Sequence, residues 1–320
     1  MSEIETSHIT NNKNLPSKFQ RWFSTRGWQI YEHQLCMISE FKKGNSCLLI
    51  APTGSGKTLS GFLPSLIELC ELPFENKLKP KLHTLYISPL KALSVDVQRN
   101  LQIPITEMDL PILCETRTSD TSPKKRNRQK VKPPNILLTT PESVELMLAW
   151  PEAKNYFSNL STIIIDEIHS VIGNKRGDLL SLSITTLRNY APNASFIGLS
   201  ATVADSGQLA KWLSPKPNKV TILKPDITKK IDVEIYYPTS NEIPFAGHSA
   251  DYAVADIYQM ISAHKISLIF VNTRAQAELL FQSLWKENNN DLHIGLHPVS
   301  YTHLRAHETR HDLVCRLLLE

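Results

Sequence analysis

The stretch SCLLIAPTGSGKTLSGFLPSLIEL constrains the fold more than any other part of the sequence. Its apolar run Cys47–Ile50 predicts a buried strand, and the periodic segment after the glycine-containing turn predicts a helix. In such a strand–turn–helix unit, Gly54 and Gly56 let backbone N–H groups approach a phosphate. The amine of Lys57 can reach the terminal phosphates, and the hydroxyl of Thr58 can hold Mg²⁺ at the positive end of the helix. The stretch therefore predicts a nucleotide-binding α/β domain.

A second motif, STIIIDEIHS, narrows the class of nucleotide-binding protein. Its isoleucines predict another buried strand, and Asp166 at the carboxyl end is placed to hold Mg²⁺ through water. Glu167 is suited to orient or deprotonate an attacking water molecule. An acidic pair after a strand is also typical of an ordinary helix start, and an isolated His169 is more often a packed or surface residue. Because a phosphate-binding loop precedes it, the motif favours nucleotide hydrolysis.

Further apolar runs alternate with helical segments, which is the pattern of a parallel α/β sheet. Both motifs follow the carboxyl end of a predicted strand, where open α/β sheets bind their ligands. The expected strands are Cys47–Ile50, Leu82–Ile87, Ile136–Leu138, Ile163–Ile165 and Phe196–Leu199. A second α/β unit is expected from IDVEIYY, a helix near Asp251–Ala263, the strand SLIFV, another helix and LHIGLH.

The length of 320 residues is sufficient for two domains. The first is expected to end after QLAKWLSP, because the following PKPNKVTILKPDITKK is rich in Pro and Lys, as inter-domain connections are. We therefore expect a polar N-terminal extension (1–20), a first domain (21–214), a linker (215–230), a partial second domain (231–298) and a non-native tail (299–320).

Composition limits the cellular setting and the partners. The formal net charge of +4 permits a nucleic-acid partner without requiring one. The five cysteines are scattered without a C-x-x-C pair, which is typical of a reducing cytoplasm. The N-terminus is polar, and no apolar run is long enough to span a bilayer, so we expect a cytoplasmic protein without a membrane partner.

The motifs APTGSGKT, DEIH and LSAT (199–202) resemble, in this order and spacing, motifs I, II and III of DExH-box helicases of the second superfamily. YISPLKAL, LLTTPESV and LIFVNTRAQAE resemble motifs Ia, Ib and IV, and Gln34 stands where the adenine-reading glutamine of the Q motif is expected. RGWQIYEHQ, GNKRGD and IPFAGH are similar to the large-helicase-related (Lhr) family. Within it the sequence is most like the bacterial branch of ligase-associated DEXH helicases of the DNA damage response.

This resemblance implies a P-loop NTPase with a complete RecA-like domain and a partial second RecA-like domain. It implies single-stranded-DNA-dependent ATP hydrolysis, translocation from the 3′ end and unwinding of DNA or DNA–RNA hybrids in DNA repair, with a ligase as a possible associate. The implied cofactors are ATP and Mg²⁺. The implied cofactor-binding residues are Gln34, Thr53, Gly54, Ser55, Gly56, Lys57 and Thr58, with Thr58 and Asp166 holding Mg²⁺. The implied catalytic residues are Lys57, Asp166, Glu167 and His169, and Ser200 and Thr202 are implied to couple ATP to nucleic acid.

Contacts to a sugar–phosphate backbone require hydroxyls, backbone N–H groups and cations. The candidates are Pro89, Lys91, Arg117, Thr140, Glu142 and Ser143 in the first domain, and Thr273 and Arg274 in the second. Thr140 and its neighbours also fit a plain helix start. The basic run at 123–132 fits either a solvated helical face or a DNA-facing surface.

The end of the sequence departs from the family. HETRH (307–311) matches the zinc pattern H-E-x-x-H, but a third ligand at the usual distance is missing, so a metalloprotease is the least favoured interpretation. Reverse translation of 299–309 and 313–320 gives codons that resemble sequencing adapters, so we expect a translated adapter on a truncated gene. Motifs V and VI would then be missing, and the chain would bind ATP but hydrolyse it poorly and not unwind. The sequence is also compatible with an RNA-directed helicase and with a non-catalytic ATP-gated nucleic-acid-binding module.

Overall fold

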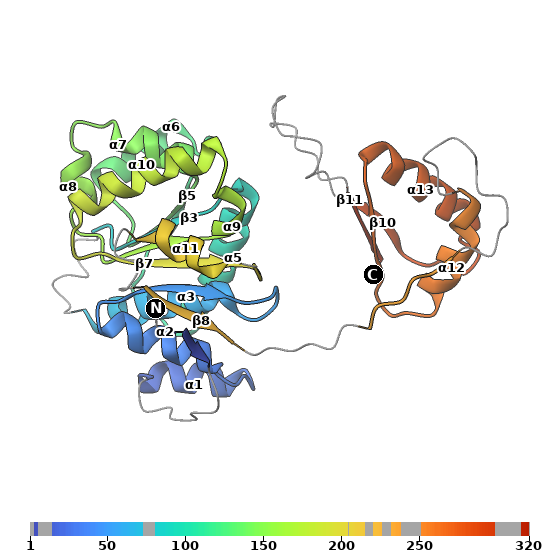
Figure 1. The fold of residues 1–320 in the computed structure, drawn as a ribbon, viewed down its shortest axis with the longest axis horizontal. Coiled ribbons are helices and arrows are strands. Elements are labelled where there is room, and N and C mark those ends of the chain that lie inside the picture. The colour runs from blue at the N-terminus through green and yellow to red at the C-terminus, as the bar shows by residue number, and fades with distance from the viewer. Residues whose placement is uncertain are drawn as a thin grey trace. The chain divides into compact units, whose positions relative to one another are not determined.

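The computed structural model divides the chain into two compact units, residues 1–229 and 230–320 (Figure 1). It describes residues 3–5, 15–72, 81–203, 205–214, 220–225, 232–237, 251–297 and 315–319. In this part of the chain, no helix combines the length and the apolar composition needed to cross a membrane.

The first unit is built on one parallel sheet with the strand order β1-β8-β2-β7-β6-β3-β5-β4. The strands are β1 (Glu3–Glu5), β2 (Ser46–Ile50), β3 (Thr84–Ile87), β4 (Cys114–Arg117), β5 (Ile136–Thr139), β6 (Thr162–Ile165), β7 (Ser195–Ser200) and β8 (Val220–Lys224). The predicted α/β class and its parallel sheet are confirmed.

Strand β8 lies within the stretch expected to be the linker. It pairs with β2, and three of its apolar side chains are buried: Val220, Ile222 and Leu223. The first unit therefore does not end at Ser214. The short apolar run VTIL specifies a buried strand even though Pro and Lys flank it, and the flanking composition misled the prediction.

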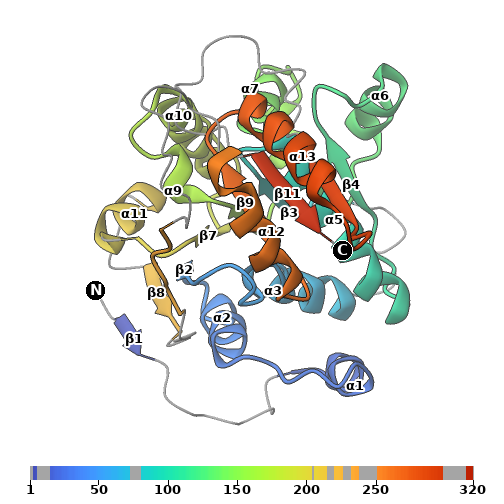
Figure 2. The same ribbon diagram turned by 90° about the vertical axis from the view of Figure 1, so that its right-hand side faces the viewer.

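Helices cover both faces of this sheet (Figure 2). One layer contains α1 (Ser17–Thr25), α2 (Glu32–Lys42), α3 (Lys57–Glu71) and α5 (Lys91–Glu107); the other contains α7 (Pro141–Leu148), α8 (Ala153–Phe157), α9 (Ile168–Val171), α10 (Lys175–Tyr190) and α11 (Ser206–Leu213). Side chains alternate along each strand, so Leu49 packs against the first layer and Leu48 against the second. A further helix, α6 (Pro123–Val131), buries only Gln129.

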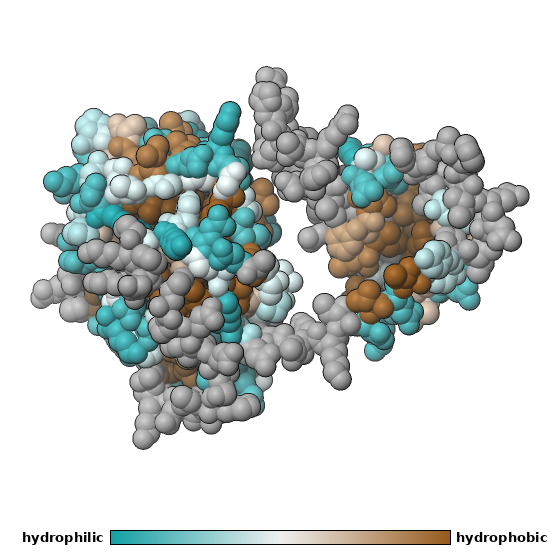
Figure 3. Space-filling model, in the orientation of Figure 1, coloured by the Kyte–Doolittle hydropathy of each residue, from teal (hydrophilic) through white to brown (hydrophobic). Residues whose placement is uncertain are grey.

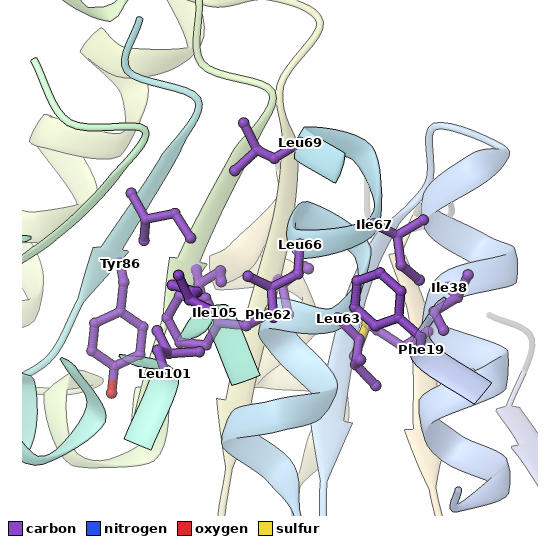
Figure 4. Packing of buried hydrophobic residues seen from close by; sticks show 14 of the residues in the cluster. Phe19, Ile38, Phe62, Leu63, Leu66, Ile67, Leu69, Tyr86, Leu101 and Ile105 are labelled. Carbon is purple, nitrogen blue, oxygen red and sulfur yellow. The ribbon is translucent and has the colours of Figure 1, made fainter. Parts of the chain in front are cut away.

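The core of the first layer is drawn in Figure 4. Phe19 of α1 and Ile38 of α2 lie together at one end, and Phe62 of α3 lies toward the sheet. Tyr86 of β3 lies beside Leu101 of α5, and its hydroxyl points away from the labelled apolar side chains. This hydroxyl is the one polar end in an otherwise apolar group of labelled residues.

The second unit has a smaller sheet in the order β10-β11-β9. Its elements are a short 3₁₀ turn η3 (Asp251–Ala253), α12 (Val254–Ser262), β9 (Leu268–Val271), α13 (Arg274–Glu287), β10 (Ile294–His297) and β11 (Cys315–Leu319). Strand β11 pairs antiparallel with both neighbours, and it comes from residues 299–320, which the sequence predicts to be non-native. Residues 232–237, from the stretch IDVEIYY with which the second unit is expected to begin, lie outside any helix or strand.

The apolar cluster of the second unit is small. It contains the buried residues Val254, Ile261, Leu280, Leu284 and Ile294. Leu268 and Phe270 of β9 are 48% and 55% exposed, and apolar surface is visible on this unit in Figure 3. Among the described residues, the second unit therefore has a much smaller buried apolar cluster than the first.

Candidate nucleotide-binding site

The predicted phosphate-binding loop connects β2 to α3 at the carboxyl edge of the sheet. Gly54 and Gly56 have φ angles of 77° and 74°, in the left-handed region that favours glycine. A Cβ atom at Gly56 would lie 3.0 Å from Nε2 of Gln34, so a side chain there would also have to shift the Gln34 amide. Helix α3 begins at Lys57, so its first N–H groups and the positive end of its dipole face the loop.

The amine of Lys57 is held inside this loop. Its Nζ donates a hydrogen bond of 2.7 Å to the carbonyl oxygen of Ala51, and the side chain is buried. Ser55 donates to the carbonyl oxygen of Pro52 at 2.7 Å, which fixes the turn from within. Thr53 and Gly54 are exposed at the tip of the turn.

The first turn of α2 packs against the same loop. The side-chain oxygen of Gln34 accepts from the backbone N of Tyr31 at 3.0 Å and caps the helix. The Nε2 of His33 lies 3.1 Å from the carbonyl oxygen of Ser55 and donates to it, since a carbonyl oxygen can only accept. The sequence interpretation missed His33, and only its position one residue before Gln34 could have suggested it.

The acidic pair of DEIH follows β6 directly. The two oxygens of Asp166 accept from different donors: Oδ1 from the backbone N of Glu167 at 2.9 Å, and Oδ2 from the hydroxyl of Tyr86. Burial raises the pKa of Asp166, while the hydrogen bonds from Tyr86 and Glu167 oppose that rise. Burial and the neighbouring Asp166 charge raise the pKa of Glu167. Glu167 has a φ of 46°, a strained conformation that recurs at functional sites.

His169 connects DEIH to the LSAT motif. Its Nδ1 lies 3.2 Å from Oγ of Ser200, 3.3 Å from the backbone N of Ala201 and 3.4 Å from a carboxylate oxygen of Glu167. Ser200 ends β7 and is fully buried, whereas Thr202 is exposed. The structure therefore brings Glu167, His169 and Ser200 together, and the coupling role of Thr202 stays a prediction.

These residues fit ATP and Mg²⁺. Strands β2, β7 and β6 are adjacent, so the loop and the acidic pair leave the same edge of the sheet. The positive charge of Lys57 lowers the pKa of both Asp166 and Glu167, against the larger rise that burial causes. Thr58 lies half-buried in the first turn of α3, where its hydroxyl is available to a cation beside a phosphate. A nucleotide with Mg²⁺ requires backbone N–H groups and an amine to bind its phosphates, and a hydroxyl and a carboxylate to bind the cation. The loop, Lys57, Thr58 and Asp166 provide these groups.

Arg117, predicted to contact nucleic acid, is used within the domain. Its Nη1 donates to the carbonyl oxygen of Arg126 at 2.8 Å and lies 3.4 Å from Oε1 of the buried Gln129. Its guanidinium lies 4.7 Å from the centre of the Trp150 ring, and burial lowers its pKa. Arg117 thus ties β4 to α6, and its contact with nucleic acid stays a prediction.

The LLTTPESV stretch, which resembles motif Ib, begins a helix, as the helix-start interpretation of Thr140 and its neighbours predicts. Thr140 is the N-cap residue of α7, and its Oγ1 lies 3.2 Å from Oγ of Ser143. Glu142 accepts from Arg176 of the GNKRGD stretch at 2.5 and 3.2 Å. A nucleic-acid role of these three candidates would therefore add to a helix-start role.

The remaining nucleic-acid candidates lie at other helix starts. Pro89 is buried before α5, and Lys91 lies 3.3 Å from Asp120 at the surface. In the second unit, Thr273 caps α13 by accepting from the backbone N of Gln276, and Arg274 pairs with Glu278 at 2.8 Å. His307 and His311 of HETRH lie outside the described residues, in which no group of three His, Cys, Asp or Glu could hold a metal.

Comparison with known proteins agrees with this geometry. A family model described as DEAD/DEAH box helicase matches residues 31–209. The ATP-dependent helicase Lhr-Core of Methanothermobacter thermautotrophicus is 34% identical over 309 residues, covering 91% of this chain and 36% of that protein. The Lhr helicase/uracil glycosylase of Escherichia coli is 36% identical over 268 residues, covering 74% of this chain and 17% of that protein.

A solved structure gives the same result. The Mycobacterium smegmatis helicase Lhr bound to ssDNA and AMP-PNP matches with a TM-score of 0.74 and 34% identity, covering 86% of this chain and 36% of that chain. The chain thus spans about a third or less of the length of these relatives. Because the family model covers more than half of the sequence, the chain belongs to the DEAD/DEAH box helicase family, and its sequence and fold are similar to those of Lhr helicases.

Proposed function

We propose that the first unit of this chain binds ATP and Mg²⁺ and that the whole protein is an Lhr-type ATP-dependent helicase that translocates on single-stranded DNA. The observation that carries the proposal is the meeting of three motifs at one edge of the parallel sheet. Lys57 follows β2, the Asp166–Glu167 pair follows β6, and Ser200 ends the strand between them. Ligands of open α/β sheets bind at this edge.

Each motif has a distinct role in the proposed reaction. The loop N–H groups and Lys57 bind the phosphates, and the raised pKa of Glu167 suits it to receive a proton from the attacking water. When bound, Mg²⁺ would neutralise charge on the phosphate oxygens, with Thr58 and Asp166 as its nearest protein groups. His169 touches both Glu167 and Ser200, so a change at the nucleotide can move the LSAT segment.

Single-stranded DNA is the proposed track because the nucleic-acid candidates lie along the same edge. Lys91 follows β3 and Thr140 follows β5, and these strands continue the sheet beyond the one that carries DEIH. Hydroxyls and helix starts of this kind suit backbone contacts without base reading. The Mycobacterium smegmatis relative was solved with ssDNA, which supports DNA as the ligand. The role in DNA repair and the association with a ligase stay predictions.

Nucleotide binding is tested with Lys57→Ala. The variant loses a charge-assisted contact to phosphate, so the affinity for a fluorescent ATP analogue should fall by about tenfold or more. Lys211→Ala removes an exposed lysine of α11 and should leave the affinity unchanged. Equal affinities of the Lys57→Ala variant and the unaltered chain, measured by fluorescence titration, would contradict the proposal.

The choice of nucleic acid is tested with DNA and RNA oligonucleotides of the same sequence. We expect the intact gene product to hydrolyse ATP faster with single-stranded DNA than with single-stranded RNA, measured as phosphate release. Greater stimulation by RNA would favour an RNA-directed helicase. Binding of ATP and of nucleic acid without ATP hydrolysis would favour a non-catalytic ATP-gated module.

A further inference from the structure

We propose that Tyr86 is a positioning residue for Asp166 and thereby strengthens the Mg²⁺-dependent part of ATP binding. The inference rests on the proposed function, because it assigns a new residue to the same site. Tyr86 lies inside YISPLKAL, a stretch in which the sequence indicates only Pro89 and Lys91 as functional candidates.

The sheet register explains why the two side chains meet. Tyr86 pairs with Ile164 of β6, and the backbone N of Asp166 donates to the carbonyl oxygen of Ile87 at 2.9 Å. Side chains two residues apart on a strand share a face, so Asp166 points to the same side as Ile164 and Tyr86. Tyr86 is therefore a diagonal cross-strand neighbour of Asp166, at a separation that a long aromatic side chain can span.

The Tyr86 ring has little freedom to turn away. It is fully buried, and its centre lies 5.2 Å from the centre of the Phe62 ring, with the two planes tilted by 32°. Leu101 of α5 packs beside it (Figure 4). Packing thus directs its hydroxyl to Oδ2 of Asp166, to which it donates, while the Ser88 side chain hydrogen-bonds with the same hydroxyl.

This contact fixes the plane of the Asp166 carboxylate. The backbone N of Glu167 holds Oδ1, and Tyr86 holds Oδ2, so rotation about the terminal torsion would break both hydrogen bonds. Each carboxylate oxygen keeps a second acceptor position. Those positions are the ones that water molecules around Mg²⁺ can use, so Tyr86 orients the carboxylate toward the cation. Partners that orient metal-binding groups in this way commonly change metal affinity by about 10- to 100-fold.

The test compares nucleotide affinity with and without Mg²⁺. A fluorescent non-hydrolysable ATP analogue is titrated into the full chain in Mg²⁺ and in EDTA, and the readout is the Kd in EDTA divided by the Kd in Mg²⁺. Tyr86→Phe removes the hydroxyl and keeps the ring, so we expect this ratio to fall about tenfold while Kd in EDTA is unchanged. The matched control is Tyr156→Phe, because the Tyr156 hydroxyl is buried without a hydrogen-bond partner in the described part of the chain.

A purely structural role for Tyr86 would change stability or both Kd values together and would leave their ratio unchanged. An unchanged ratio in Tyr86→Phe would therefore overturn the inference. In an Asp166→Asn background, Tyr86→Phe should have no further effect on the ratio, because the hydroxyl acts through that carboxylate. Failure of the unaltered chain to bind the nucleotide at all would instead overturn the proposed function, and this inference with it.

A second measurement keeps the test valid if Tyr86→Phe does not fold. 3-Fluorotyrosine at position 86 keeps the hydrogen bond, and its ¹⁹F signal reports the surroundings of the ring. We expect the signal to shift when Mg²⁺ is added to the nucleotide-bound chain, and the same probe at position 156 to stay unshifted. Absence of a shift at position 86 would overturn the inference.

Discussion

His33 shows how a single residue outside the predicted site can maintain its shape. Its ring stacks on Tyr31, with the ring centres 5.3 Å apart, and its Nε2 donates to the Ser55 carbonyl of the phosphate-binding loop. Burial lowers the pKa of His33 below its ordinary value of 6.5, more than the contact with Ser55 raises it. The folded chain therefore holds His33 neutral under conditions where the unfolded chain begins to protonate it.

This difference predicts a pH dependence of stability. Because the unfolded state binds the His33 proton more readily, lowering the pH through about 6.5 favours unfolding. We expect the free energy of unfolding to fall more steeply from about pH 7 to about pH 5 in the unaltered chain than in His33→Asn. Urea unfolding at a series of pH values measures this, with the exposed His264→Asn as control. If the free energy of unfolding varied with pH in the same way in the unaltered chain and in His33→Asn, protonation of His33 would not contribute to the pH dependence of stability.

Residue identities can be predicted where a motif carries its chemistry locally. Lys57 and Asp166 are identifiable because their strands and turns are contiguous in sequence. The contact between Tyr86 and Asp166 could not be found in this way, because it depends on β3 and β6 being neighbours although β4 and β5 lie between them in sequence. Arg117 shows a different limit of sequence reasoning. The sequence suggests it as a nucleic-acid contact but does not reveal its intramolecular partners, the carbonyl oxygen of Arg126 and the ring of Trp150.

At the scale of elements, the start of α10 joins the DEIH segment to motif Ib. Asn174 caps the helix by accepting from the backbone N of Gly177 at 3.0 Å, and Arg176 pairs with Glu142 of α7. A Cβ atom at Gly177 would lie 1.9 Å from the carbonyl oxygen of Val171, at the end of α9. Glycine is therefore required by the close approach of two backbones, directly after the segment that contains DEIH.

We expect Gly177→Ala to destabilise the first unit by at least ~2 kcal/mol, because backbone must move to admit the methyl group. Gly61→Ala is the matched control, since its Cβ would meet side-chain atoms only, with the tip of Leu199 nearest at 3.1 Å, and alanine favours a helix. Denaturant unfolding of both variants measures the difference. A stability loss in Gly177→Ala no greater than that in Gly61→Ala would contradict this prediction. It would show that the backbone at the end of α9 can move with little loss of folding free energy.

The elements that sequence alone predicts best are the central strands. Apolar runs such as Ile163–Ile165 are buried on both faces, as the prediction of a parallel sheet requires. β8 was missed because its apolar run is short and flanked by residues typical of linkers. Its pairing with β2 is a tertiary effect that local composition does not encode.

At the scale of the whole molecule, the two units differ in the size of their hydrophobic cores. The first has an apolar layer on either side of its sheet, whereas the described residues of the second form one small cluster. The division falls after Lys229, so every strand of the larger sheet lies within residues 1–229. Both of its layers are therefore built from that part of the sequence alone.

We expect residues 1–229, produced alone, to fold cooperatively and to bind the ATP analogue with the affinity of the full chain. Calorimetry and fluorescence titration measure the two properties, with Lys57→Ala in the shorter chain as the negative control for binding. A broad, non-cooperative transition would contradict this independence. Loss of binding in a folded fragment would show that residues beyond Lys229 complete the site.

Helix α6 has one more consequence for how the molecule would respond to salt. Arg126 donates to the carbonyl oxygens of Thr118 and Ser119, Arg128 pairs with Glu115, and Lys130 pairs with Glu152 at 2.9 Å. Arg128 and Lys130 are neutralised by carboxylates and would displace few ions from a DNA backbone, whereas Lys124, Lys125 and Lys132 have no ion pair among the described residues. This basic run would therefore make DNA affinity less dependent on salt than its six cations suggest, because folding has already released the counterions of the two that are paired with carboxylates.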